Sequence, residues 1–275
     1  MSAATSGAPA GPPRWRPAPA IVISIALHLI ALVVFLFTPT AWPWLAATLV
    51  ANHLVLTALV LCPRSRLLGP NLSRLPAAAA ARGEIALTFD DGPDPAVTPH
   101  VLDLLDRHAM KASFFCIGDQ ARAFPEIVRE IARCGHSVEN HSDRHTHAFA
   151  LFGLSGLARE VDAAQASLTA LTGCAPRFFR APAGFRSPLL DPVLARRGLR
   201  YASWTRRSYD TVRTDPQVAL RALTRDLAGG DVLLLHDGNA ARTADGTPMV
   251  LAVLPALLDT LASRGLKSVT LPTAG

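Results

Sequence analysis

Two long apolar runs near the start of the chain constrain its structure more than any other sequence feature. Residues 1–62 contain no Asp or Glu, and residues 20–37 and 44–61 are runs of 18 residues without a charged side chain. As a helix, each run would extend about 27 Å, close to the ~30 Å hydrocarbon core of a bilayer. Trp42 and Trp44 lie at the turn between them, as interfacial aromatic residues do. We therefore predict a transmembrane helical hairpin over residues 20–62.

Two other structures contain apolar runs of this kind: a buried hairpin in a soluble protein and a cleaved signal peptide. Arg14 and Arg16 would form the basic start of a signal peptide, but no clear A-x-A cleavage site follows and a second apolar run does. His28 and His53 each lie ten residues from the turn, and so at one depth. We expect them to face the partner helix and to hydrogen-bond across the hairpin, with a proton path as the alternative.

Composition separates the hairpin from the rest of the chain and excludes some functions. Residues 1–19, rich in Ala, Pro and Gly, predict a disordered tail, and residues 63–82 a juxtamembrane linker before a domain at 83–275. The 27 Lys and Arg residues exceed the 21 Asp and Glu residues, but they form no basic run with interleaved aromatics, so we predict no nucleic-acid binding. The four cysteines form no CxxC motif, which argues against a cysteine zinc site and indicates reduced, mostly buried thiols.

From residue 83 onward, short β-rich runs alternate with helical patterns, which predicts a parallel sheet that is either doubly wound or closed into a barrel. The candidate strands are 84–89, 112–117, 137–140, 177–179, 201–204, 232–235 and 268–271. Polar residues follow several of them: Asp90 and Asp91 the first, His141 the third, Arg180 the fourth and His236 the sixth. In a barrel these strand ends open on one face, so we expect the side chains to converge.

Two of these polar segments have the composition of a metal site. Asp90 and Asp91 lie side by side before a Gly-Pro turn, although an Asp pair at a turn is by itself common. His141 and His145 are four residues apart, a spacing typical of paired metal ligands, with His147 close behind. Imidazole and carboxylate donors together suit Zn²⁺ or a similar ion, so we predict one divalent metal, with Co²⁺, Mn²⁺ and Ni²⁺ as alternatives to Zn²⁺.

Four motifs follow one another in the chain: TFDDGP, HSDRH, RAPAG and LLHD. In this order they resemble the polysaccharide deacetylases, the NodB-homology domain of carbohydrate esterase family four, over about residues 83–271. The resemblance implies an α/β fold, a distorted (β/α)₇ TIM-like barrel, here preceded by two transmembrane helices. It also implies a hydrolase of carbon–nitrogen amide bonds outside peptides, which uses a divalent metal to remove N-acetyl groups from amino sugars.

The resemblance assigns roles to individual residues. It implies that Asp91, His141 and His145 are the metal ligands. It makes Asp90 the general base, Arg180 the residue that keeps this base ionised and oriented, and His236 the general acid. The residues that it places in contact with substrate are Leu234, Trp204, Ala183, Gly184 and Asp210.

The chain departs from the family pattern at two motifs. After Trp204 the family usually has two Asp residues, the second followed by Trp, whereas Arg207 stands here in place of the first Asp and Thr211 in place of the second Trp. The carboxylate that tunes the general acid is therefore either Asp210 or another group. Ala183 occupies a position that is frequently aromatic, and a smaller side chain there would open the pocket.

These observations support several functions. The first is hydrolysis of the N-acetyl amide of an N-acetylglucosamine-type polysaccharide, oligosaccharide or lipid-linked glycan, with release of acetate. The alternatives are a deformylase or deacylase of an amino sugar on a lipid carrier, and a catalytically silent, membrane-anchored sugar-binding module. The expected partners are an amino-sugar glycan and the lipid bilayer. The sequence has no signal for an oligomeric state.

The arginines around the hairpin predict its orientation. Arg14 and Arg16 precede the first run, Arg64, Arg66 and Arg74 follow the second, and the turn between the runs has no charge. The positive-inside rule then places both ends of the hairpin, and with them the catalytic domain, on the cytoplasmic face of the inner membrane. The alternative is the periplasmic or extracellular face, where many members of the family act on wall polymers.

Overall fold

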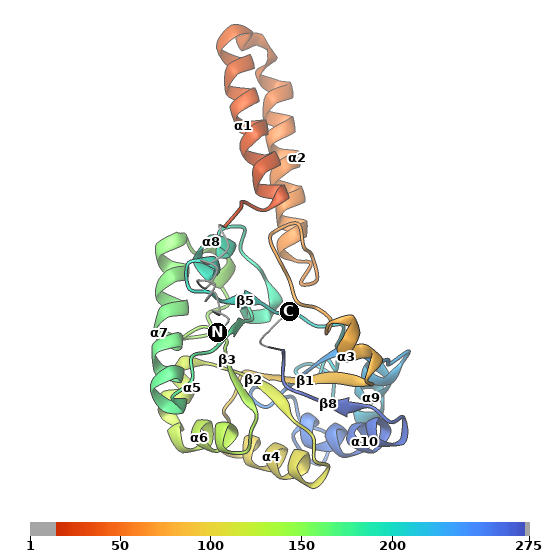
Figure 1. Cartoon of the computed structure of the whole chain (residues 1–275). Coiled ribbons are helices and arrows are strands. Elements are labelled where there is room, and N and C mark those ends of the chain that lie inside the picture. Colours follow the sequence, from red (N-terminus) through yellow and green to blue (C-terminus); the bar gives the residue numbers. More distant parts are fainter. Residues whose placement is uncertain (1–14, 273–275) are drawn as a thin grey trace, which may run out of the picture.

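The computed structural model describes residues 15–272, in which two apolar helices form a hairpin that projects from an α/β domain (Figure 1). Most of the predicted tail lies outside the described residues. Helix α1 (Pro19–Phe37) and helix α2 (Trp42–Val60) are joined by a short 3-10 turn at Pro39–Ala41. Both are long and apolar enough to cross a membrane, with mean hydropathies of 2.9 and 1.6. Their large apolar side chains are mostly exposed, unlike those of a core helix.

Polar side chains link the two helices of the hairpin at one point. The Asn52 amide donates a hydrogen bond to the Ser24 hydroxyl over 2.9 Å, and both residues are buried. His28 and His53 lie at one depth, with ring centroids 5.3 Å apart and edge to face. The predicted hydrogen bond between them is not formed: the two rings meet edge to face, and each Nδ1 binds the backbone carbonyl one turn earlier in its own helix.

The domain is built on a parallel sheet that curves into an open, distorted barrel, as predicted. Its strand order is β5-β4-β3-β2-β1-β7-β6, with β8 paired to β1. The central strands β1, β2 and β7 are buried along almost their whole length, which explains why they appear as continuous apolar runs in the sequence. The strands are β1 (Glu84–Asp90), β2 (Ala112–Cys116), β3 (Ser137–Asn140), β4 (Phe178–Phe179), β5 (Arg200–Tyr201), β6 (Arg206–Arg207), β7 (Val232–His236) and β8 (Lys267–Ser268).

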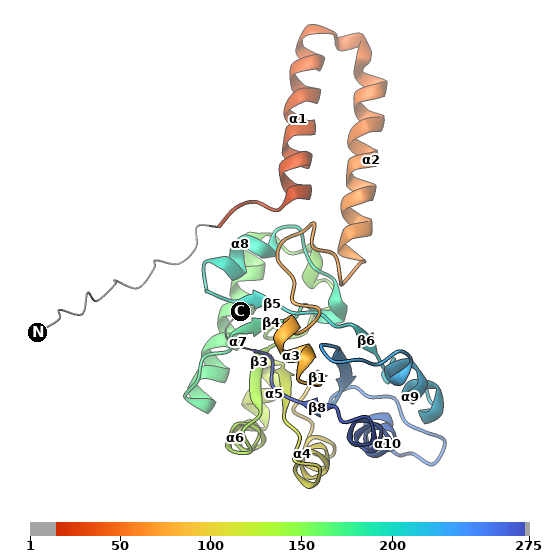
Figure 2. The same cartoon turned by 45° about the vertical axis from the view of Figure 1, so that its right-hand side comes forward.

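Amphipathic helices cover the outside of this sheet (Figure 2). In α6, for example, Val128 and Ile131 are fully buried against the sheet while the acidic and basic residues of that helix face solvent. The helices of the domain are α3 (Ala77–Ala81), α4 (Thr98–Arg107), α5 (Gly118–Ala123), α6 (Pro125–Arg133), α7 (Leu154–Thr172), α8 (Leu190–Ala195), α9 (Pro216–Thr224) and α10 (Met249–Ser263).

Seven of the eight strands coincide with predicted ones to within three residues, and β6 was not predicted. This two-residue strand consists of Arg206 and Arg207, which have no strand-like pattern, and it forms only by pairing with β7. All four cysteines are free, as expected. The expectation that they are mostly buried is wrong, because only Cys116 is buried and Cys62 and Cys174 are exposed.

The segment 63–82, predicted as a linker, packs against the domain over much of its length. Leu72 donates a backbone hydrogen bond to Tyr201 and accepts one from Ser203, so it extends the edge of the sheet beyond β5. Arg74 forms an ion pair with Asp231 over 2.8 Å at the start of β7. The segment thereby connects the hairpin directly to the framework of the barrel.

The first described residues are also attached to the domain. The Trp15 indole donates a hydrogen bond to the Asp191 carboxylate of α8 over 2.7 Å. The backbone N–H of Ala20, in the first turn of α1, donates to the carbonyl of Leu67 over 3.1 Å. Both ends of the hairpin are thus held against the domain.

Candidate functional site

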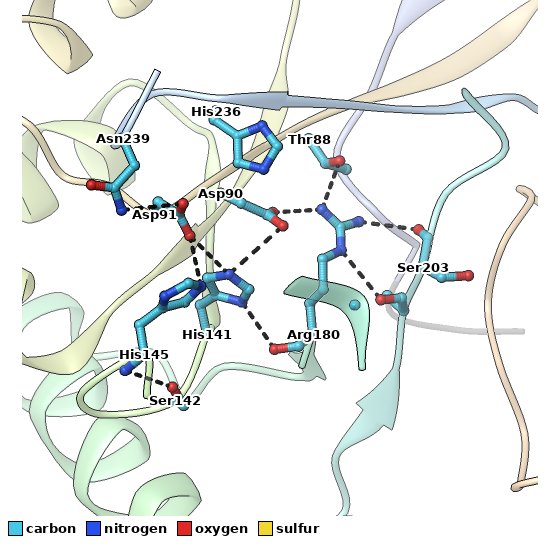
Figure 3. Close-up of polar contacts among 12 residues, drawn as sticks. Thr88, Asp90, Asp91, His141, Ser142, His145, Arg180, Ser203, His236 and Asn239 are labelled. Atoms are coloured by element: carbon cyan, nitrogen blue, oxygen red, sulfur yellow. Dashed lines mark hydrogen bonds and ion pairs between the residues drawn. The ribbon is translucent and has the colours of Figure 1, made fainter. Parts of the chain in front are cut away.

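The polar residues that follow the strands converge in one place, as the sequence predicts (Figure 3). Asp90 ends β1, and in the sheet register it lies beside His236, the last residue of β7. His141 follows β3 and Arg180 follows β4, which pairs with β3. All four side chains are buried, together with Asp91. The site is therefore positioned by the carboxyl ends of β4, β3, β1 and β7, which lie at one edge of the same parallel sheet.

Asp91, His141 and His145 form a cluster that could hold a metal ion. Oδ1 of Asp91 lies 3.1 Å from Nε2 of His141 and 3.0 Å from Nε2 of His145. One donor atom from each of the three residues lies within 4.8 Å of the others. Nδ1 of His141 donates to the Arg180 carbonyl over 2.9 Å, which directs Nε2 toward the cluster. His147 lies beside His145 and is not part of the cluster.

The chemistry and the backbone of this cluster fit a divalent cation. One carboxylate and two imidazoles with open positions are a donor set that Zn²⁺ and similar ions accept. Asp91 and His145 have φ values of 73° and 50°, a left-handed conformation that costs energy in non-glycine residues and is found preferentially at functional sites. The residues present therefore fit the predicted metal.

Electrostatic interactions within the cluster favour the charged forms of Asp91 and His141. Burial raises the pKa of the Asp91 carboxyl, but hydrogen bonds from His141 and His145 outweigh it and bring the pKa well below its usual range. Burial lowers the pKa of His141, and the neighbouring Asp90 and Asp91 carboxylates more than reverse this.

Asp90 is held by the buried guanidinium of Arg180. Nη1 of Arg180 lies 2.6 Å from Oδ1 of Asp90 and also donates to the Thr88 hydroxyl over 2.9 Å. Its other nitrogens donate to the backbone carbonyls of Ala202 and Ser203. Arg180 is thus fixed by four hydrogen-bond partners and occupies only one oxygen of Asp90. The second oxygen remains directed toward the cluster, 3.8 Å from Nε2 of His141.

His236 is paired with a carboxylate that lies behind it. Nδ1 of His236 lies 2.7 Å from Oδ1 of Asp210, and the other Asp210 oxygen accepts the His236 backbone N–H over 2.9 Å. Burial lowers the pKa of His236, but the hydrogen bond and charge of Asp210 outweigh it and raise the pKa above its usual value. Asp210 is fully buried and does not line the pocket, so the structure places it as a partner of His236.

A pocket of about 590 Å³ is lined by Asp90, Asp91, His141, His145 and His236. Four residues predicted to contact substrate also line it: Leu234, Trp204, Ala183 and Gly184. Gly184 is required there, because a Cβ at this position would lie 2.5 Å from the Trp204 ring. Arg207 and Thr211, the two departures from the family pattern, line the same pocket.

Sequence reasoning missed one residue of the site, Asn239. Its amide donates to the Asp91 carboxylate over 3.3 Å, and its side chain lines the pocket (Figure 3). The only signal for it in the sequence is its position, three residues after His236 in the loop that follows β7. A single Asn in a loop is too common to be singled out by type.

Comparison with known proteins is consistent with this geometry. Residues 78–202 match the family model described as polysaccharide deacetylase. The chain is 33% identical over 207 residues to a chitooligosaccharide deacetylase of Sinorhizobium fredii, an alignment that covers 73% of this chain and 96% of the relative. It is 32% identical over 199 residues to a peptidoglycan-N-acetylglucosamine deacetylase of Bacillus cereus, covering 70% of this chain and 68% of that protein.

Solved structures agree with these sequence relatives. The Bc1960 peptidoglycan N-acetylglucosamine deacetylase superposes with a TM-score of 0.66 and 28% identity, over 74% of this chain and 91% of that one. A family 4 carbohydrate esterase from Streptomyces lividans, in complex with acetate, superposes with a TM-score of 0.61 and 32% identity, over 68% and 91% of the two chains. The four motifs, the sheet topology and these similarities show that the chain belongs to the polysaccharide deacetylase family.

Proposed function

We propose that the protein is a metal-dependent hydrolase that removes the N-acetyl group from an N-acetylglucosamine-containing glycan and releases acetate. The observation that carries this proposal is the meeting of three groups in one pocket: the Asp-His-His cluster, an Asp held by a buried Arg, and a His paired with a buried Asp. The relatives named for chitooligosaccharide and peptidoglycan deacetylation support the class of substrate.

In the proposed reaction, Asp91, His141 and His145 would hold the divalent cation, which when bound would polarise the amide carbonyl and make water more acidic. Asp90 accepts the proton of the attacking water with its free carboxylate oxygen. Arg180 keeps this carboxylate ionised and fixes its orientation through the 2.6 Å contact with Oδ1. A base positioned in this way contributes about 10²–10⁴-fold to a rate.

His236 completes the reaction on the other side of the pocket. An amine leaves poorly unless its nitrogen is protonated, and the protonated imidazole of His236 donates that proton. Asp210 stabilises the protonated ring and fixes which nitrogen faces the pocket, because it binds Nδ1 and leaves Nε2 free. Asp210 therefore serves as the carboxylate that tunes the acid, although the other Asp of the family motif is replaced by Arg207.

The direct test is acetate release from N-acetylglucosamine oligomers by the purified full-length protein in detergent. We expect release after loading with Zn²⁺, Co²⁺, Mn²⁺ or Ni²⁺, and none after chelation. Comparison of the four ions also identifies the one that supports the highest activity. Absence of acetate with every ion, in protein shown to bind metal, would favour a silent sugar-binding module.

The pairing of His236 with Asp210 predicts a pH dependence. Activity requires protonated His236, so it should fall as the pH rises through the raised pKa of this residue. Asp210→Asn removes the charge that raises the pKa, so this alkaline limb should move to lower pH. The measurement is kcat/KM against pH for both proteins, with Asp215→Asn, at the exposed start of α9, as the control. An alkaline limb at the same pH in Asp210→Asn would rule out the proposed tuning.

We further propose that the hairpin crosses the inner membrane twice, with the catalytic domain on the cytoplasmic face. Basic residues Arg16, Arg64 and Arg66 flank its two ends, and both ends lie against the domain. A C-terminal fusion at Gly275 to green fluorescent protein should then fluoresce, and a fusion to alkaline phosphatase should be inactive. An active phosphatase would place the domain on the opposite face.

A further inference from the structure

A second cavity adjoins the active-site pocket and reaches the end of α2. It measures about 430 Å³, and Ala183, Trp204 and Arg207 line both this cavity and the active-site pocket. Its far side is formed by Leu61 and Arg64, directly after α2. A molecule that reaches from the active site past Arg207 would meet this cavity and, beyond it, the base of α2.

Arg207 stands at the junction of the two cavities as a cation without an anionic partner. Within residues 15–272, no carboxylate forms an ion pair with its guanidinium, and its buried Nε has no hydrogen-bond partner. The rings of Trp204 and Tyr209 flank the guanidinium at 5.8 and 5.1 Å and hold it in place. Its neighbour Arg206 differs, because it pairs with Asp231 over 2.6 Å.

A second arginine faces the same cavity near the hairpin. Arg64 lines it, and the only side-chain hydrogen bond of Arg64 within the described residues is a long one, 3.4 Å, to the Thr205 carbonyl. A buried donor without a partner costs free energy, so an anionic ligand that pairs with Arg207 would be bound favourably. A guanidinium fits phosphate oxygens in a bidentate manner, and both arginines can reach one cavity.

The outer end of the cavity is apolar and adjoins the helices of the hairpin. Leu61 is 56% exposed and Phe185 is 37% exposed, and both line the cavity. Figures 1 and 2 show α2 descending to this side of the domain. From the active site outward, the residues are thus the catalytic groups, the unpaired Arg207, the apolar Leu61 and Phe185, and then α2, whose composition is that of a membrane-spanning helix.

We propose that the substrate is an amino sugar carried on a long-chain lipid phosphate. Its sugar occupies the active site, its phosphate binds Arg207 with Arg64, and its chain leaves past Leu61 toward the bilayer. This inference rests on the proposed deacetylation and specifies its substrate class. An uncharged polymer would leave the Arg207 guanidinium unpaired, and for that reason we favour the lipid phosphate.

The test compares three substrates on the full-length, metal-loaded protein in nanodiscs. They are N-acetylglucosamine linked through phosphate to a long-chain prenol, the same sugar as an uncharged long-chain alkyl glycoside, and a soluble N-acetylglucosamine oligomer. Wild type should show a kcat/KM about 10- to 100-fold higher for the phosphate-linked substrate than for the alkyl glycoside, the range expected of one charge-assisted contact. Arg207→Gln should bring this ratio close to one, and Arg207→Lys should restore part of it.

Arg213→Gln is the matched control. The Arg213 guanidinium lies 4.9 Å from the ring of Tyr209, which also flanks Arg207, but Arg213 lines neither cavity. It should therefore keep the wild-type ratio. An equal loss in Arg213→Gln and Arg207→Gln would attribute the preference to general attraction and overturn the assigned site.

A binding measurement separates failure of this inference from failure of the proposed function. Sugar-free long-chain prenyl phosphate should bind wild type in nanodiscs about 10-fold or more tightly than Arg207→Gln, and inorganic phosphate at equal concentration should not displace it. Acetate release from the oligomer with a substrate ratio of one and no such binding would overturn the lipid-phosphate site and leave the deacetylase intact. Binding that depends on Arg207 without acetate from any substrate would support the site and contradict the deacetylase.

Discussion

Asp90→Asn is expected to lower kcat by about 10²–10⁴-fold while the protein retains its metal, because the substitution removes only the proton acceptor. The amide of Asn can still occupy the place of the carboxylate beside Arg180, so the framework should persist. Single-turnover and steady-state rates of acetate release would measure the loss, and elemental analysis of the same sample would measure bound metal.

Arg180→Lys provides a second measurement of the same interaction. Lys keeps the positive charge but replaces a guanidinium that donates to Asp90, Thr88 and two backbone carbonyls. Its kcat should lie between those of wild type and Asp90→Asn. A kcat for Asp90→Asn within a few-fold of wild type, with metal bound, would show that another group is the base.

Asp91→Ala and His141→Ala are expected to abolish stoichiometric metal binding, and activity with it. Each removes one of the three donors of the cluster, and the loss of Asp91 also leaves the buried His141 and the half-buried His145 without the carboxylate between them. Bound metal should be measured by elemental analysis after dialysis, and folding by circular dichroism. We expect metal below one tenth of an equivalent in both variants.

His147→Ala is the matched control for metal content. His147 is the third imidazole of the same loop and lines the same pocket, but it is not part of the cluster. It should retain about one equivalent of metal. Full metal loading in Asp91→Ala, or loss of metal in His147→Ala, would mean that a different set of donors holds the ion.

The convergence of Asp90, Asp91, His141 and His236 could be predicted because each lies at the end of a run that was predicted as a strand. Parallel strands bring their carboxyl ends to one edge, so position along the chain translates directly into position in space. The same reasoning predicted most strands of the barrel. It also predicted that His28 and His53 lie at one depth, since helical rise is constant.

Other features depend on contacts that no local pattern records. The pairing of His236 with Asp210 requires β6, a strand of two arginines that exists only through its pairing with β7. The hydrogen bond across the hairpin is made by Asn52 and Ser24, whereas Nδ1 of each histidine binds a backbone carbonyl of its own helix. In both cases the bond that forms depends on which polar groups the folded chain brings within hydrogen-bonding distance.

The attachment of the hairpin to the domain at both ends has a consequence for how the enzyme meets its substrate. Trp15 is bound to α8, Ala20 to Leu67, and Leu72 and Arg74 to the sheet. Few residues therefore remain as a flexible linker between the hairpin and the domain. With the hairpin embedded in a bilayer, the active site could therefore act only on groups that lie close to the membrane surface. For the lipid-phosphate substrate proposed above, the search would then take place in two dimensions, and turnover in the cell would depend on substrate molecules per unit area of membrane instead of per unit volume.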